Sequence, residues 1–191
     1  MHDNEGVRYE SPKLKVMGIE SVRSSTPTAC RDKLKKSFDI IVNKDEETIQ
    51  NFISDFRQEF EILPIEDIAF PRSVQGIQKY ADTQNLYAKG TPIHVKATRL
   101  YNHYLKEKKL QDKYPVIQEG EKIKFIYLKE PNPIRDSVIA MMNGLPKEFE
   151  LHNYIDYEKQ FAKLFKGPLN EILKVIGWTP EKVNNLSNFF I

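Results

Sequence analysis

Residues 13–27 read KLKVMGIESVRSSTP, and this stretch leads from an extended segment through a turn into a helix. In its first half, apolar residues alternate with Lys13 and Lys15, within a longer segment at 7–19 that is typical of a half-buried edge strand. At its end, Ser25-Thr26-Pro27 predicts a helix start, with a hydroxyl N-cap followed by proline in the first turn. The stretch therefore predicts both a strand and a helix.

Cations and hydroxyl groups gather around the same turn. The set comprises Lys13, Lys15, Arg23, Ser24 and Ser25. Cations beside a helix N-terminus are typical of a site that binds phosphate. An ordinary strand, turn and helix cap explains the same residues, so this stretch alone leaves both interpretations open.

Helical spacing of apolar residues continues beyond this stretch. A first helix is predicted from residue 25 to about 42, with an apolar face made of Leu34, Phe38, Ile41 and Val42. A second helix is predicted over about 46–62, where apolar residues recur at intervals of three and four: Ile49, Phe52, Ile53, Phe56 and Phe60. Asn43-Lys44-Asp45 interrupts them, so we expect a helical hairpin. Further helices are predicted over about 93–110, 154–165 and 168–176, the last two separated by Gly167-Pro168.

Strand signals are fewer. Residues 64–92 contain Pro64, Pro71 and Gly76 and are predicted to be rich in loops. A β-hairpin is predicted at about 114–128, where apolar residues alternate around Glu119-Gly120-Glu121. The sequence therefore predicts an α+β fold, a mainly helical subdomain with a small antiparallel sheet or hairpin.

Composition is ordinary for a soluble globular protein: 40% of the 191 residues are hydrophobic, 29% are charged, and the net charge is +2. Basic residues crowd 13–36 and 89–113, which indicates either a basic face or charges that coat solvated helices. The single cysteine, Cys30, excludes an internal disulfide and is interpreted as a packing residue. No signal peptide is recognisable and no apolar run approaches the roughly 20 residues that span a bilayer, so we expect a cytoplasmic protein, in a bacterium or an infected host cell, with no membrane partner.

Catalytic and metal-binding motifs are not found in the sequence. It contains no P-loop, no dinucleotide-binding fingerprint and no nucleophile elbow, and its histidines lack the spacing of metal ligands. We therefore predict no catalytic residue, no metal site and no cofactor in this chain, and we do not expect an enzyme that acts alone.

Four blocks of sequence resemble family B DNA polymerases of tailed phages and follow the order of that family. They are KLKVMGIESVRSSTP at 13–27, DIAFPRSV at 67–74, KGTPIHVKATRL at 89–100 and FIYLKEPNP at 125–133. The first resembles the junction between palm and thumb, and the others resemble parts of the thumb. The resemblance implies a C-terminal thumb portion, with residues 1–24 as a palm-edge strand and junction and residues 25–178 as the thumb subdomain.

In this interpretation the chain holds primer–template DNA through backbone phosphates and supports processive replication. The implied contact residues are Lys13, Lys15, Arg23, Ser24, Ser25, Arg72, Ser73, Lys96 and Arg99. Lys96 and Arg99 are three residues apart and share a helix face, along which a phosphate strand could run. The family's palm aspartates and Mg²⁺ ions have no counterpart here, since Asp82-Thr83 lacks the second aspartate. We therefore expect a large palm-containing polymerase fragment to supply them, whether the chain is a split-gene subunit or a cloned piece.

Residues 179–191 are predicted to be a clamp-binding tail. The resemblance implies that Leu186, Phe189 and Phe190 dock on a sliding clamp, as the terminal peptides of phage-type polymerases do. Val183 stands where such peptides often carry glutamine, and a tail that folds back on the core is the alternative. A different class of function is also open, a non-catalytic adaptor protein that binds a sliding clamp or a polymerase.

Overall fold

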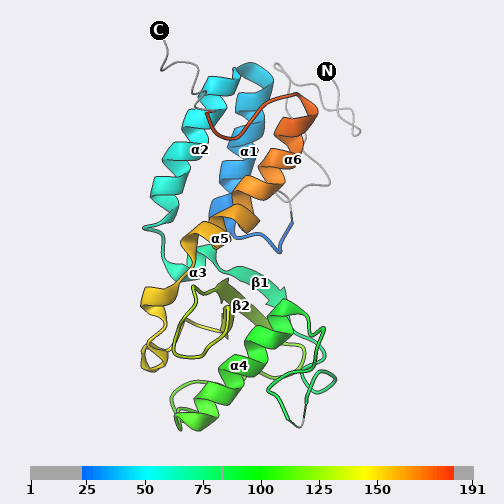
Figure 1. Ribbon diagram of the computed structural model, residues 1–191, viewed down its shortest axis with the longest axis vertical. Helices are drawn as coiled ribbons and strands as arrows, with labels where there is room; N and C mark the ends of the chain where they lie inside the picture. Colours follow the sequence, from blue (N-terminus) through cyan, green and yellow to red (C-terminus); the bar gives the residue numbers. More distant parts are fainter. Residues whose placement is uncertain (1–22, 83, 183–191) are drawn as a thin grey trace, which may run out of the picture.

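A helical hairpin forms one end of the molecule in the computed structural model, which describes residues 23–82 and 84–182. Helices α1 (Thr28–Asn43) and α2 (Glu46–Phe60) stand along the long axis in Figure 1. The side chain of Asp45 caps α2, because it accepts a hydrogen bond from the amide of Thr48 at 2.8 Å. The predicted hairpin is confirmed, with its break at the predicted residues.

The start and the far end of α1 differ from the prediction. Pro27 is the residue before the helix, and no side chain in the described part of the chain caps the first turn. Proline suits this position because its ring fixes φ near the value that the helix needs. Val42 is 63% exposed in the last turn of α1, next to the connection to α2, so its placement on the buried face was wrong.

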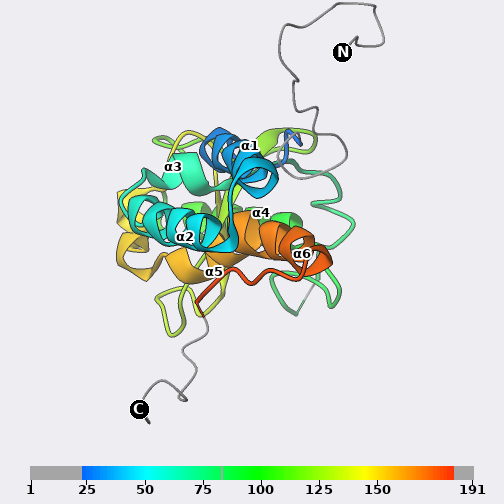
Figure 2. The same ribbon diagram turned by 90° about the horizontal axis from the view of Figure 1, so that it is seen from above.

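The C-terminal helical segment packs beside the hairpin (Figure 2). It consists of α5 (Tyr157–Phe161), the π-helical turn η4 (Ala162–Lys166) and α6 (Gly167–Val175). The ring centroids of Phe56 and Phe165 lie 4.8 Å apart, and those of Phe60 and Phe161 lie 5.3 Å apart. Such edge-on pairs stabilise a core beyond simple burial, so phenylalanines join α2 to the C-terminal segment.

The predicted separation of the last two helices at Gly167-Pro168 is wrong. The amide of Gly167 donates to the carbonyl of Ala162, five residues earlier, and this wider turn continues directly into α6. Pro168 has no amide to donate, and its ring would press on a carbonyl in a regular α-helix. A single π turn therefore accommodates the proline without ending the helix.

A three-stranded antiparallel sheet forms the other end of the molecule. Its strands are β1 (Phe70–Ser73), β2 (Lys122–Tyr127) and β3 (Val138–Met141), with β2 in the centre. The short helix α3 (Ile65–Ile68) precedes β1, so residues 64–92 contain more regular structure than predicted. Pro71 is tolerated because β1 is an edge strand. The register places Ser73 opposite Lys122, which matters for the site below.

The predicted β-hairpin at 114–128 is wrong, although β2 occupies its second half. The backbone amide and carbonyl of Ile117 both bond to the side chain of Asn102, at 2.9 Å each. These backbone groups are therefore satisfied by α4 and do not pair with β2. The strand instead pairs with β1 and β3, which lie before and after it in the sequence.

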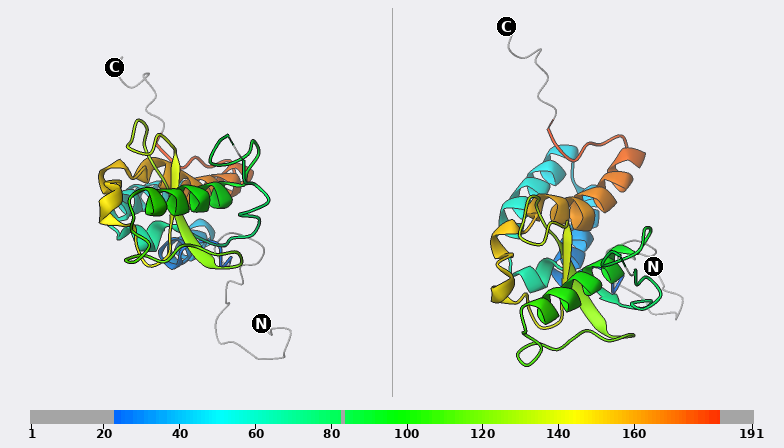
Figure 3. Two further views of the ribbon diagram at one scale, coloured as in Figure 1. Left: turned by 90° about the horizontal axis from the view of Figure 1, so that it is seen from below. Right: turned by 60° about the horizontal axis from the view of Figure 1, so that its bottom comes forward.

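Helix α4 (Ile93–Glu107) packs against β2 and β3 (Figure 3). It begins where the sequence predicts and ends earlier, since Lys109 adopts a left-handed φ of 54°. The short 3₁₀ helices η2 (Lys147–Phe149) and η3 (His152–Tyr154) connect β3 to α5. The predicted α+β class is confirmed. Within the described residues, no helix has both the length and the hydropathy required to cross a membrane.

Candidate nucleic-acid interface

Four of the predicted contact residues meet at the edge of the sheet. Ser24 and Ser25, before α1, lie beside Arg72 and Ser73 of β1, and together with Pro71 and Lys122 they line a hollow of about 320 Å³. We call this hollow the basic groove. Its charged lining residues, Arg72 and Lys122, are both cations, and its serines add hydroxyl groups that can donate to anionic oxygens. The arrangement suits a phosphate group.

Arg72 connects the two parts of the basic groove. Its Nη1 donates to the carbonyl oxygens of Ser25 and Pro71, each at 2.9 Å. These bonds hold the segment before α1 against β1, although the two are far apart in the sequence. The remaining guanidinium donors are available to a ligand by this geometry, because a guanidinium carries five N–H groups.

Burial modifies the electrostatics around Arg72. Desolvation lowers the pKa of Arg72, but the group stays charged near neutral pH because the ordinary pKa of arginine is far above 7. The pKa of His94 is lowered as well, first by burial and then by the charge of Arg72. His94 is therefore neutral at pH 7, and within the described residues its side chain does not cap α4.

Lys96 lies elsewhere and contacts protein groups. Its Nζ is 2.7 Å from Oδ1 of Asp136, and it sits 4.8 Å from the ring centroid of Tyr87. The hydroxyl of Tyr87 donates to Oδ2 of Asp136 at 2.6 Å, and Asp136 is only 6% exposed. Burial alone would lower the pKa of Lys96, but Asp136 and Tyr87 outweigh it and the pKa is raised. The ammonium group thus neutralises a buried carboxylate.

Arg99 is also bound internally. Its Nη1 donates to the carbonyl of Ile77 at 2.6 Å, and its Nε donates to the carbonyl of Leu86. Both carbonyls belong to the loop between β1 and α4, so Arg99 fastens that loop to the helix. The structure does not bring Lys96 or Arg99 to the basic groove.

The other predicted residues fall at or beyond the ends of the described chain. Arg23 is exposed at the start of the described chain, next to Ser24. Outside the described residues lie the predicted strand at 7–19 with Lys13 and Lys15, and the tail residues Leu186, Phe189 and Phe190.

Sequence reasoning missed Lys122 as a groove residue. It belongs to a stretch, KIKF, in which Lys122 and Lys124 alternate with buried Ile123 and Phe125. That alternation was visible and places both lysines away from the apolar face. The missing information was the pairing of this strand with residues 70–73, which brings Lys122 opposite Ser73.

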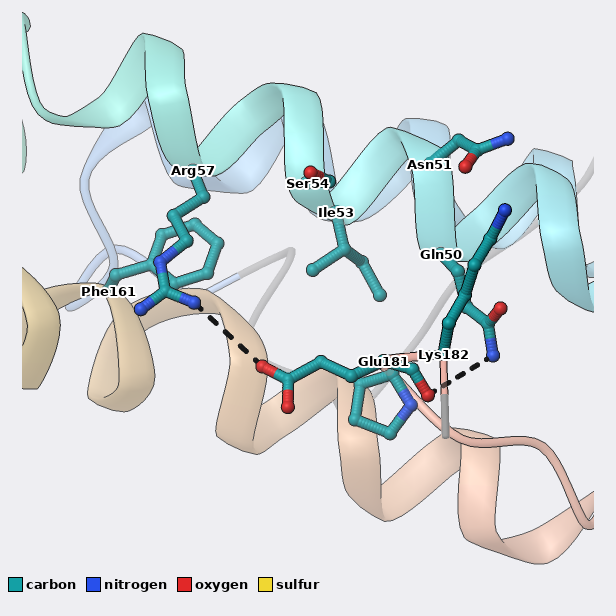
Figure 4. Close-up of a pocket in the computed structure, with 9 residues that line it drawn as sticks. Gln50, Asn51, Ile53, Ser54, Arg57, Phe161, Glu181 and Lys182 are labelled. Atoms are coloured by element: carbon teal, nitrogen blue, oxygen red, sulfur yellow. Dashed lines mark hydrogen bonds and ion pairs between the residues drawn. The ribbon is translucent and has the colours of Figure 1, made fainter. Parts of the chain in front are cut away.

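A second pocket, of about 370 Å³, lies at the helical end between α2 and residues 178–182, which we call the C-terminal strap (Figure 4). The amide of Thr179 donates to Oε1 of Glu46 at 2.7 Å, and Nε2 of Gln50 donates to the carbonyl of Thr179 at 3.1 Å. Lys182 pairs with Glu47 at 2.9 Å. The C-terminal strap is thus held along α2 at the point where the predicted tail begins.

The described residues offer binding groups and no evident catalyst. Among them, no cluster of His, Cys, Asp or Glu side chains could hold a metal ion. Cys30 is fully buried, as predicted for a packing residue, and burial raises its pKa to about 12, so it is a poor nucleophile.

The comparison with known proteins supports the sequence resemblance. No protein-family model matches the sequence. The chain is 30% identical, over its whole length, to a DNA-directed DNA polymerase of Enterobacteria phage T4. It is also 34% identical, over 98% of its length, to a DNA-directed DNA polymerase of Escherichia phage RB69. This chain resembles part of a phage DNA polymerase. The aligned region is 21% of each relative, so the chain spans about one fifth of their length.

Proposed function

We propose that this chain is the thumb portion of a family B DNA polymerase and that it holds primer–template duplex through backbone phosphates. The observation that carries this proposal is the basic groove, where Ser24, Ser25, Arg72 and Ser73 meet beside Lys122. These residues come from separate parts of the chain, and Arg72 bonds directly to the segment before α1. The similarity to DNA-directed DNA polymerases supports DNA as the ligand.

The groove residues would make two kinds of contact with a phosphate group. Arg72 and Lys122 supply positive charge, while the serine hydroxyls donate hydrogen bonds to phosphate oxygens. Such contacts fix the position of a duplex and carry no direct sequence information, as a replicative enzyme requires. A palm outside residues 1–191 would supply the catalytic carboxylates and the Mg²⁺ ions. The chain's part is to keep the primer end in place and so to raise processivity.

Lys96 and Arg99 have a different role in this proposal. Both are predicted phosphate contacts, yet their charged groups bind Asp136 and the loop carbonyls of Ile77 and Leu86. We assign them to the support of the loop and of α4. Lys13, Lys15 and Arg23 remain predicted phosphate contacts.

The test is the salt dependence of duplex binding by the full chain. Fluorescence anisotropy with a labelled primer–template would be measured over a range of KCl concentrations. Lys122→Ala should lower the slope of log K against log salt by about 0.9, the loss of one phosphate contact. Lys44→Ala is the matched control, because Lys44 is an exposed cation beyond the other end of α1, about 24 Å away. An unchanged slope for Lys122→Ala, or no duplex binding at low salt, would refute the proposal.

A non-catalytic adaptor that binds a sliding clamp or a polymerase is the second candidate, and the C-terminal strap is compatible with both candidates. Contacts with Glu46, Glu47 and Gln50 hold the strap on α2, so a clamp-binding peptide that follows it would start from a fixed point. In both proposals Leu186, Phe189 and Phe190 bind a sliding clamp. Primer extension by the cognate palm-containing fragment, with and without this chain, separates the two. Longer products only when both are present support the thumb, whereas no effect supports the adaptor.

A further inference from the structure

The basic groove continues past Pro71 into a second hollow. This adjoining hollow has a volume of about 250 Å³ and shares Ser24 and Pro71 with the basic groove. Its polar lining comprises Ser24, Thr28, Arg31, Glu66, Asp67 and Lys124. An extended ligand that lies across Pro71 would therefore contact both hollows.

Arg31 has an unsatisfied hydrogen-bond donor, which favours a ligand in the adjoining hollow. Its Nη2 donates to Oγ1 of Thr28 at 2.8 Å, but its Nε is buried and has no hydrogen-bond partner among the described residues. No carboxylate of the described chain lies within ion-pair distance of its guanidinium. A buried donor without a partner is unfavourable, and a modest turn of the guanidinium toward an anion in the hollow would satisfy it.

Two further groups favour an anion in the adjoining hollow. The first turn of α1 borders it, and no described side chain caps that turn, so its amide groups can donate to an anionic oxygen. Lys124 also lines the adjoining hollow, and its Nζ donates to the carbonyl of Glu66 at 2.8 Å. This bond fixes the position of the ammonium group of Lys124. The other N–H donors of that group do not bond to this carbonyl and can donate to an anion.

Glu66 and Asp67 limit what the adjoining hollow can attract. Two carboxylates offset the charges of Arg31 and Lys124, so the hollow has little net positive charge. The carboxylate of Glu66 is directed toward Gly144, since its Oε1 would lie 3.3 Å from a Cβ atom placed there. A free anion therefore gains little by long-range attraction, whereas a phosphate carried in by a strand already held at the basic groove meets donors at close range.

We propose that the adjoining hollow binds a second backbone phosphate, next to the one in the basic groove on the same strand. Successive phosphates of one strand are neighbours in space, and the two hollows are neighbours that share Ser24 and Pro71. Arg31, Thr28 and Lys124 are then contact residues, and the inference rests on the proposed function of the groove. Asp67 sets the affinity, because its carboxylate opposes the incoming phosphate.

The experiment pairs protein variants with chemically altered DNA. Duplexes that carry one neutral methylphosphonate linkage, moved along each strand in turn, would be bound to the full chain and to Arg31→Ala and Lys122→Ala. Arg31→Ala should lower the salt slope by about 0.9, as Lys122→Ala does. At one position, the neutral linkage should weaken DNA binding by the wild type but should not further weaken binding by Arg31→Ala. At the neighbouring position on the same strand, the neutral linkage should weaken binding by the wild type but should not further weaken binding by Lys122→Ala. Asp67→Asn should tighten binding.

The possible failures are distinguishable. If the wild type binds duplex and Lys122→Ala changes the slope while Arg31→Ala does not, the second phosphate is refuted and the proposed function stands. If the sensitive linkages lie on different strands, the inference is likewise overturned. If the wild type binds no duplex, both proposals fall. Arg31→Lys is the control for misfolding, because it keeps the positive charge and should keep the salt slope of duplex binding. Inorganic phosphate at constant ionic strength should not remove the contribution of Arg31; if it does, the hollow binds a free anion.

Discussion

The cations at the edge of the sheet and those on α4 differ in what their charged groups contact. Arg72 and Lys122 border a groove whose lining contains no carboxylate. Lys96 instead neutralises the buried Asp136, and Arg99 bonds to two loop carbonyls. Arg72, Lys96 and Arg99 all belong to blocks that resemble the same family, yet the charged groups of Lys96 and Arg99 are committed to protein partners.

The difference follows from the burial of the groups that each cation contacts. A carboxylate that is 6% exposed, such as Asp136, must be paired, so a nearby lysine is committed to it. The groove residues have serine hydroxyls beside them and no buried carboxylate in the lining, so no such pairing is required there. Removing a cation should therefore destabilise the fold on α4 and weaken ligand binding at the sheet edge.

Lys96→Met should have the largest effect on stability. The variant leaves Asp136 buried without its cation, which costs about 3 kcal/mol of unfolding free energy. Urea denaturation followed by circular dichroism measures the change. Adding Asp136→Asn should recover part of the loss, because the neutral amide needs no counter-charge. If Lys96→Met were as stable as the wild type and lowered the salt slope of DNA binding, Lys96 would be a phosphate contact and the comparison would fail.

Arg99→Met should have the next largest effect, about 2 kcal/mol, because two carbonyls lose a charged donor. The loss should be local, so hydrogen exchange is the sharper measurement. The amides of Tyr80 and Ala88 bond within the loop and should exchange faster than in the wild type. Arg99→Lys should restore only part of the protection, since one ammonium group cannot span both carbonyls as the guanidinium does. Unchanged protection in Arg99→Met would show that the loop does not depend on this residue.

Arg72 lines the basic groove and also bonds to backbone carbonyls, so it combines features of both sets of cations. Variants of Arg72 and Lys122 therefore test the comparison. Arg72→Ala should cost about 1 kcal/mol, because the hydrogen bonds to the carbonyls of Ser25 and Pro71 are lost. Lys122→Ala should change stability by less than about 0.5 kcal/mol, since Lys122 is exposed. Both should reduce the salt slope of duplex binding equally. A large loss of stability in Lys122→Ala would place it with the α4 cations.

The helices could be predicted because their signals are local. Apolar residues spaced three and four apart define α2, and proline marks the starts of α1 and α4. The sheet could not be predicted in the same way. Strand β1 has four residues, one of them Pro71, and it becomes a strand only because β2 pairs with it from far along the chain. Strand β3 is buried on both sides and lies in a stretch rich in proline and glycine, which conceals it.

The candidate site shows the same division. The sequence identified Ser24, Ser25, Arg72 and Ser73 as predicted contacts, and these four residues line one hollow. It could not separate these from Lys96 and Arg99, because the partners that occupy them, Asp136 and the carbonyls of Ile77 and Leu86, are distant in sequence or belong to the backbone. A residue's charge is local information, whereas the availability of that charge depends on tertiary structure.

An ion pair at the surface gives the smallest expected effect and marks the weak end of the comparison. Glu148 pairs with Lys113 and accepts a hydrogen bond from the hydroxyl of Tyr114 at 2.9 Å. Lys113, its own backbone amide and Tyr114 lower the pKa of Glu148 from 4.5 to about 2. Because the folded-state pKa is the lower one, the pair's contribution to stability is complete above pH 4.5 and disappears as the pH falls toward about 2.

Glu148→Gln should therefore be slightly less stable than the wild type near neutral pH, and the difference should vanish near pH 2. Urea midpoints of the two proteins across this range measure it, and added salt should shrink the difference at every pH, since exposed pairs are screened. Lys113→Gln should produce the same profile, and combining the two variants should add little. A difference that persisted at low pH would mean that Glu148 acts through the neutral contact with Tyr114. In that case the effect of Glu148 would come from a hydrogen bond and not from its charge, and the contrast between paired and available charges would rest on Lys96 and Arg99 with their internal partners.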